Sequence, residues 1–225
     1  MASKKNIPLK KKILIVDDHP IMRQGLAQLI NHEGDLAVCG EAEDAHAAMK
    51  AIEQFRPDLV TVDITLPGKG GMELIKDIRV QHPALAMLVV SMHDESLYAE
   101  RVLRAGARGY IMKQEGGMRL MQAVRQVLSG QLYVSEKMSA RIVELFAVGR
   151  PSAEKNSLGS LTDREFEVFQ LIGQGRGTRQ IAEHLHLSVK TVEVHRLHIK
   201  EKLKLTDAPS LVRHAVRWVE TQNLG

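Results

Sequence analysis

The chain has 225 residues, of which 44% are hydrophobic, 26% charged and 4% aromatic, as in ordinary globular proteins. This composition excludes disordered, collagen-like and disulfide-scaffold classes, and the single cysteine, Cys39, excludes an internal disulfide and a cysteine-based zinc site. Five lysines near the N-terminus contribute more positive charge than the whole net charge of +4, so the rest of the chain is nearly neutral. The overall charge therefore says little about a nucleic-acid partner.

The chain length predicts one large domain or two small ones. The N-terminal residues lack the apolar run of a signal peptide, and the longest apolar stretch, Ala84–Val90, is far shorter than the ~20 residues of a membrane span. We therefore expect a cytoplasmic protein that does not interact with a membrane.

The first part of the chain, residues 12–129, alternates short β-branched runs with helical segments, which favours βαβ units in a parallel sheet. Five strands are predicted, at Lys12–Val16, Ala37–Gly40, Leu59–Val62, Met87–Val90 and Gly109–Met112. Helices are predicted at Ile21–Asn31, Ala45–Phe55, Met72–Val80, Leu97–Ala105 and Met118–Leu128. In such doubly wound domains, ligands bind beyond the carboxyl ends of the strands.

The second part of the chain contains no strand-like run. A further helix is predicted at Ser139–Phe146, and the Gly-, Ser- and Pro-rich segment Gly149–Ser160 reads as a linker. The remaining residues have apolar positions at helical spacing, which predicts a small all-helical domain.

Polar residues follow the predicted strands at their carboxyl ends. Asp17 and Asp18 follow the first strand, Asp63 ends the third, Ser91 ends the fourth and Lys113 follows the fifth. Crowded carboxylates repel one another and raise their pKa values unless a cation lies among them, and an all-oxygen donor set suits Mg²⁺. Such a site predicts phosphoryl transfer to Asp63 as nucleophile, with the lysine and the serine hydroxyl contacting the phosphoryl oxygens.

These positions lie in motifs that resemble the receiver domain of bacterial response regulators over residues 11–132. The motifs are Ile15-Val16-Asp17-Asp18-His19-Pro20, Val62-Asp63-Ile64-Thr65-Leu66-Pro67-Gly68, Ser91-Met92-His93 and Gly109-Tyr110-Ile111-Met112-Lys113. The resemblance implies a flavodoxin-like (βα)5 fold with a parallel five-stranded sheet.

The same resemblance implies a role for each matching residue. Asp63 would be the phosphoacceptor. Asp18, Asp63 and the backbone carbonyl of Thr65 would bind Mg²⁺, with Asp17 acting through water. The switch and phosphoryl contacts would be Ser91, Tyr110 and Lys113, the serine hydroxyl moving toward the phosphoryl group while the tyrosine ring turns inward.

A helix-turn-helix pattern follows residue 160. Thr162 and Glu165 form the sequence signature of a capping box, and a short helix at Thr178–Leu185 precedes a three-residue turn. A further helix is predicted at Val189–Lys202, with Ser188 as its N-cap. The outward residues of this helix, which would face a DNA major groove, are Lys190, Thr191, Glu193, Val194, Arg196, Leu197 and Lys200.

This segment is similar to the NarL/LuxR-type four-helix output domain. The matching motifs are Leu161-Thr162-x-Arg164-Glu165, Ile181-Ala182-Glu183-x-Leu185 and Lys190-Thr191-Val192-x-Val194-His195-Arg196. The resemblance implies duplex DNA as ligand and dimerisation through the last helix. His186 stands where a left-handed turn residue is expected. Glu193 stands at a commonly basic position, where it would either accept from a cytosine amino group or reduce phosphate affinity.

Together these features predict a receiver domain at 11–132, a helix and linker at 133–160 and a DNA-binding domain at 161–225. The expected function is a transcription regulator rather than an enzyme, phosphorylated by a sensor histidine kinase and acting as a homodimer on DNA with RNA polymerase as a further partner. The alternatives are an Mg²⁺-dependent phosphohydrolase and a DNA-binding protein whose receiver is an interaction module insensitive to phosphorylation.

Overall fold

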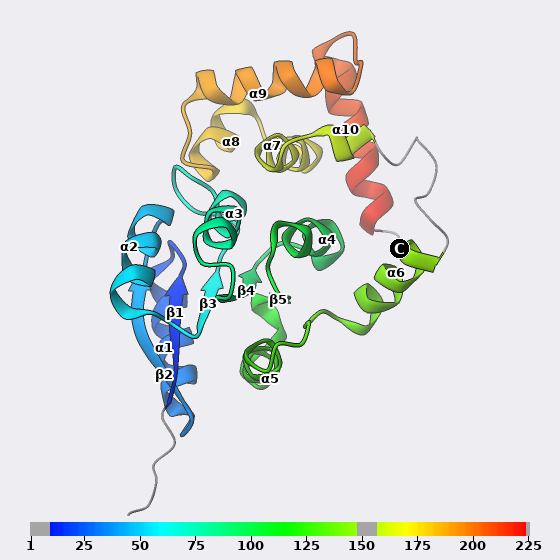
Figure 1. Cartoon of the computed structure of the whole chain (residues 1–225). Helices are drawn as coiled ribbons and strands as arrows, with labels where there is room; N and C mark the ends of the chain where they lie inside the picture. The colour runs from blue at the N-terminus through cyan, green and yellow to red at the C-terminus, as the bar shows by residue number, and fades with distance from the viewer. Residues whose placement is uncertain (1–9, 148–156, 224–225) are drawn as a thin grey trace, which may run out of the picture. The chain divides into compact units, whose positions relative to one another are not determined.

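The computed structural model describes residues 10–147 and 157–223, and the chain divides into two compact units, residues 1–142 and 143–225 (Figure 1). The division falls within helix α6 (Glu136–Ala147), a segment that the sequence pattern assigns to the connection between two domains. Each unit is described separately.

The first unit is built on a parallel five-stranded sheet whose strand order is β2-β1-β3-β4-β5 (Figure 1). The strands are β1 (Lys11–Val16), β2 (Leu36–Ala42), β3 (Leu59–Val62), β4 (Ala86–Ser91) and β5 (Gly109–Met112). The helices are α1 (Pro20–His32), α2 (Ala45–Phe55), α3 (Gly71–Gln81), α4 (Glu95–Ala105) and α5 (Gly117–Leu128), with a 3-10 turn η1 (Lys113–Glu115) before α5.

All five strands and five helices predicted for residues 12–129 are present. Among these ten elements the largest difference is β2, which runs from Leu36 to Ala42 because it pairs with β1 over the whole length of that strand. Asp63 follows β3 rather than ending it, because strand pairing between β3 and β4 stops at Val62. The parallel α/β fold predicted from the alternating pattern is confirmed.

Helices cover both faces of the sheet, and this explains the continuous apolar runs in the central strands. Helices α1 and α5 contact each other over one face, and α2, α3 and α4 follow one another over the other (Figure 1). Every residue of β3 and the last four residues of β1 are buried. The strands are thereby fixed on both sides, which holds the residues at their carboxyl ends in place.

The loop between β3 and α3 is held close to the backbone of Asp63. The Gly71 amide donates to the Ile64 carbonyl at 2.8 Å. A Cβ atom on Gly71 would lie 2.0 Å from the Asp63 carbonyl oxygen, much closer than non-bonded atoms approach. This close contact requires glycine at the start of α3.

The second unit is helical in the part of the chain that the structure describes. Its helices are α7 (Asp163–Gly173), α8 (Thr178–His184), α9 (Val189–Lys202) and α10 (Ala208–Asn223). Residues Ser157–Ser160, predicted as linker, form a 3-10 turn, η2, because the Leu161 amide donates to the Leu158 carbonyl at 3.2 Å. The rest of the predicted linker, residues 149–156, lies outside the described residues.

Helix α7 is the centre of this unit and contacts α8, α9 and α10. The Trp218 ring of α10 packs against Phe166 and Phe169, with ring centroids 5.4 and 5.7 Å apart.

Among the described residues, no helix combines the length and the apolar character that crossing a membrane requires.

Candidate functional site

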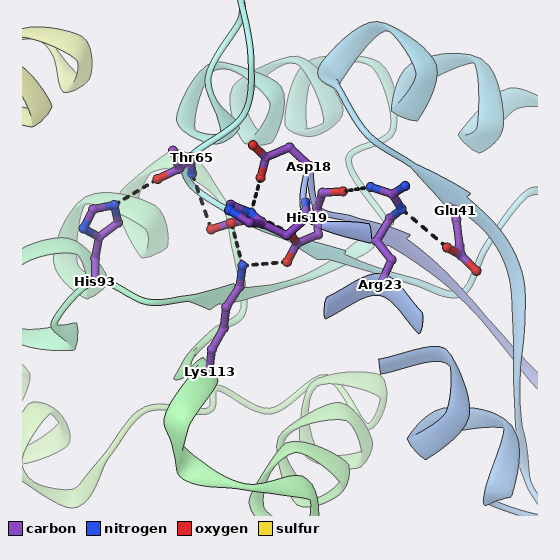
Figure 2. A network of polar contacts seen from close by, with 9 residues as sticks. Asp18, His19, Arg23, Glu41, Thr65, His93 and Lys113 are labelled. Carbon is purple, nitrogen blue, oxygen red and sulfur yellow. Dashed lines mark hydrogen bonds and ion pairs between the residues drawn. The ribbon is translucent and has the colours of Figure 1, made fainter. Parts of the chain in front are cut away.

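The carboxyl edge of the first unit's sheet holds a buried cluster of charges (Figure 2). The Lys113 ammonium lies 2.6 Å from Asp17 Oδ2 and 2.7 Å from Asp63 Oδ2. All three side chains are at most 4% exposed. Residues predicted from separate strand ends therefore meet in one pocket, where Lys113 provides the positive charge between two carboxylates.

Burial dominates the electrostatics of Asp63. It raises the pKa of the Asp63 carboxyl from 3.8 to about 6, and the Lys113 ammonium opposes this shift. The negative charge of Asp17 adds a smaller upward contribution. The main cause of the raised pKa is therefore loss of hydration rather than repulsion between carboxylates.

The pocket has the donor set of a metal site. Ligand atoms of Asp17, Asp18, His19 and Asp63 all lie within 4.8 Å of one another. Thr65 is next to this cluster, and its backbone amide donates to Asp63 Oδ1 at 3.4 Å. Clustered carboxylate oxygens are the ligands that a hard divalent cation such as Mg²⁺ prefers.

The residues expected to act as a switch are Ser91 and Tyr110. The Tyr110 ring is fully buried, and its hydroxyl donates to the His93 carbonyl at 2.8 Å. Ser91 is also buried, and its Oγ accepts a hydrogen bond from the His93 amide at 3.3 Å. Ser91 and Tyr110 are therefore both connected to the backbone of His93.

Three residues without an assigned role also belong to this network (Figure 2). His19 Nδ1 lies 2.6 Å from Asp18 Oδ1, and His93 Nε2 lies 3.0 Å from the Thr65 hydroxyl. Arg23 donates from Nη1 to the Asp17 carbonyl at 2.6 Å. Both histidines are direct neighbours or near neighbours of predicted site residues, whereas no sequence signal singles out the arginine.

In the second unit, the start of α9 is defined by two local features. Ser188 Oγ accepts from the Thr191 amide at 3.0 Å, which confirms the predicted N-cap. His186 has a φ of 52°, which confirms the left-handed turn residue between α8 and α9. The Thr191 hydroxyl lies 2.7 Å from Ser188 Oγ and so takes part in the cap.

The capping box at the start of α7 also holds α9 in place. Glu165 Oε2 accepts from the Thr162 amide at 2.8 Å and pairs with the Lys202 ammonium at 2.6 Å. These partners lower the pKa of the Glu165 carboxyl against the opposing effect of burial. Arg164 connects α7 to the end of α8 by donating to the Leu185 carbonyl at 2.8 Å.

The predicted DNA-facing residues differ in exposure. The exposed ones are Lys190, Glu193, Val194 and Leu197, and the partly buried ones are Thr191, Arg196 and Lys200. Arg196 is partly buried, and at 100° per residue it lies well away from the line of exposed residues 190, 194 and 197. Burial lowers the pKa of its guanidinium.

Comparison with known proteins agrees with this geometry. Residues 13–125 match the family model "Response regulator receiver domain", and residues 159–215 match "Bacterial regulatory proteins, luxR family". The chain is a response regulator of the LuxR family. Its receiver carries the acidic pocket, and its helix-turn-helix carries the exposed face of α9.

The response regulator is similar to a curated relative over most of its length and to solved structures over 60% to 91% of it. The oxygen regulatory protein NreC of Staphylococcus carnosus (strain TM300) is 37% identical over 92% of this chain and 97% of its own length. A crystal structure of a LuxR-family two-component response regulator from Aurantimonas sp. SI85-9A1 is 38% identical, with a TM-score of 0.57, over 60% of this chain and 96% of that one. A structure of two RcsB dimers bound to two parallel DNAs is 26% identical, with a TM-score of 0.56, over 91% of this chain and 97% of that one.

Proposed function

We propose that this response regulator receives a phosphoryl group on Asp63 from a sensor histidine kinase and thereby changes its dimerisation on duplex DNA. The observation that carries the proposal is the Lys113 ammonium 2.7 Å from Asp63 Oδ2 in a pocket of buried carboxylates. A cation at this distance can pair with a phosphoryl oxygen once Asp63 is modified.

Each residue of the pocket would have its own role in phosphoryl transfer. An Asp63 oxygen attacks the phosphorus of the kinase phosphohistidine, the P–N bond breaks, and the imidazole leaves with the bonding electrons. Asp18, Asp63 and the Thr65 carbonyl would hold Mg²⁺, with Asp17 acting through water. Bound Mg²⁺ supplies positive charge that neutralises the transferring oxygens.

Ser91 and Tyr110 then connect the pocket to the surface around β4 and β5. The Ser91 hydroxyl accepts from the His93 amide, and the Tyr110 hydroxyl donates to the His93 carbonyl. A phosphoryl oxygen that accepted a hydrogen bond from the Ser91 hydroxyl would weaken the contact between Ser91 and His93. Because Tyr110 also contacts His93, this change would alter the surroundings of the tyrosine.

The output unit would bind duplex DNA as a homodimer, with α9 in the major groove. The RcsB structure contains dimers bound to DNA, and the fold of this chain is similar to it. Two copies of a small helix-turn-helix read two half-sites, which multiplies the contact area. Bound near a promoter in the cytoplasm, such a dimer would act on RNA polymerase.

The decisive experiment compares the wild type with Asp63→Asn in Mg²⁺ and acetyl phosphate. We expect a labile phosphoryl group on the wild type alone by intact mass, together with dimerisation in sedimentation and tighter binding to a promoter fragment. Beryllium fluoride in place of acetyl phosphate should reproduce the assembly changes without covalent modification.

Two other results would overturn the proposal. Equal DNA binding by both proteins, with no adduct and no effect of beryllium fluoride, would show that the receiver is an interaction module insensitive to phosphorylation. Continuous release of phosphate from a small phosphoester, far beyond one equivalent per chain, would indicate a phosphohydrolase.

A further inference from the structure

The centre of the outward face of α9 is apolar. Val194 and Leu197 are 43% and 48% exposed, whereas Val192 and Ile199 on the opposite side of the helix are fully buried. At 100° per residue, positions 190, 194, 197 and 201 form one line along the helix, directly opposite the buried residues. We call Val194 and Leu197 the apolar stripe.

Isolated exposed apolar side chains are ordinary on protein surfaces. This pair differs because it lies at the middle of the helix face that a helix-turn-helix inserts into the major groove, where side chains reach the edges of the bases. Lys190 precedes the stripe on the same line and is exposed, so a basic side chain is available for the phosphates beside it.

The neighbouring charges favour contact between the stripe and bases rather than phosphates. Glu193 is exposed beside the stripe, and its carboxylate cannot pair with a phosphate of the DNA backbone. Arg196, which has the side chain best suited to reading guanine, is partly buried and lies well away from the stripe around the helix. At the centre of the face the chain therefore offers methyl groups and no guanidinium.

We propose that Val194 and Leu197 read the C5-methyl groups of thymines in each half-site, an inference that rests on the proposed DNA-binding function. The thymine methyl is the only apolar group that a base presents in the major groove of unmodified DNA, so an apolar stripe selects for it. The partner is therefore a duplex whose half-site centres on thymines in contact with residues 194 and 197.

The test uses the full chain with Mg²⁺ and beryllium fluoride. Duplexes are first selected from a random library, and the selected site is then synthesised with deoxyuridine in place of each thymine in turn, which removes only the methyl group. We expect uracil at each contacted position to weaken binding about fourfold, the effect of about one buried methyl group. Fluorescence anisotropy measures each affinity.

The variants link the effect to the two side chains. Val194→Ala and Leu197→Ala should each bind the thymine site more weakly and lose the preference for thymine over uracil at one position. Val189→Ala makes the same change in an exposed valine of α9 that lies about 100° from the stripe, and it should keep the full preference.

Three results would count against this proposal in distinguishable ways. Binding that changes less than twofold at every uracil position would overturn methyl readout while leaving sequence-specific binding intact. A thymine preference that persists in both stripe variants would assign the readout to other residues. A library that yields no enriched sequence would overturn the DNA-binding function itself and, with it, the inference.

Discussion

The two units of the chain place their functional charges in opposite environments. In the receiver, Lys113 and its two carboxylates are almost completely buried, whereas Lys190 and Glu193 of α9 are exposed to solvent. Buried charges depend on each other because no water replaces a lost partner, but exposed charges act nearly independently and are screened by salt. A single substitution in the pocket should therefore cause a large loss of stability. Each single substitution on α9 should weaken DNA binding only slightly.

The largest effect is expected from Lys113→Ala in metal-free buffer. This substitution leaves Asp17 and Asp63 buried beside each other without their cation, which should lower the free energy of unfolding by about 3–5 kcal/mol. Urea unfolding followed by circular dichroism measures the change, and added Mg²⁺ should restore part of the loss.

The matched control is Lys11→Ala. Lys11 pairs with Asp58 at 2.8 Å, but the two side chains are 56% and 34% exposed. Such a pair contributes less than about 1 kcal/mol. Equal losses in the two variants would contradict the contrast between buried and exposed charges.

Glu165→Ala should have an intermediate effect and tests whether the output unit also depends on a buried carboxylate. It removes the acceptor for the Thr162 amide and the partner of Lys202, so we expect a loss of about 2 kcal/mol in unfolding and weaker DNA binding. Glu165→Gln keeps the acceptor and should lose less than about 1 kcal/mol. Similar losses in both variants would show that charge, not the capping box, holds α9.

Because the pKa of Asp63 is raised, we expect Mg²⁺ binding at the proposed site to depend on pH. With a pKa of about 6, the carboxyl takes up a proton as the pH falls from 7 to 5, and this proton must leave before the metal binds. Because the folded pKa lies above the unfolded value, ionising Asp63 costs stability above pH 6, and this cost disappears as the pH falls toward 4.

Isothermal titration calorimetry should show about tenfold weaker Mg²⁺ binding at pH 5 than at pH 7, the ratio of ionised carboxylate at those values. Asp63→Asn should bind Mg²⁺ weakly with a flatter pH profile. An unchanged affinity in the wild type across this range would place the pKa of Asp63 well below 6.

The smallest effects are expected on α9. Lys190→Ala should weaken binding to every DNA sequence and reduce the slope of log affinity against log salt by about 1, the value for one phosphate contact. Arg196→Ala should act in the same direction, whereas Glu193→Ala should change sequence preference. Identical salt slopes in the wild type and Lys190→Ala would remove Lys190 from the phosphate contacts.

Most of the fold could be predicted because its elements have strong local signals. Short β-branched runs alternate with amphipathic segments, so β3, β5 and α9 begin and end at the predicted residues. β2 was predicted three residues too short, because its ends are fixed by pairing with β1 rather than by its own composition. The turn at Ser157–Ser160 was missed because glycine and serine at this position carry no helical periodicity.

The residues of the pocket could be predicted from the sequence, but their electrostatic interactions could not. Parallel strands bring their carboxyl ends together, so Asp17, Asp63 and Lys113 were expected to meet. Which group supplies the positive charge, and how far burial raises the pKa of Asp63, depend on side-chain packing that no local pattern encodes. The Arg23 contact with the Asp17 carbonyl was not predictable for the same reason.

Because of the close contact at Gly71, the pocket depends on a residue that has no side chain. Any other amino acid there would push against the Asp63 carbonyl, only a few bonds from the carboxylate that would accept the phosphoryl group. In a saturation-mutagenesis library, position 71 should therefore tolerate substitution as poorly as the charged positions themselves. A map of signalling defects would include it among the essential positions, although Gly71 contributes only the space that its missing Cβ leaves.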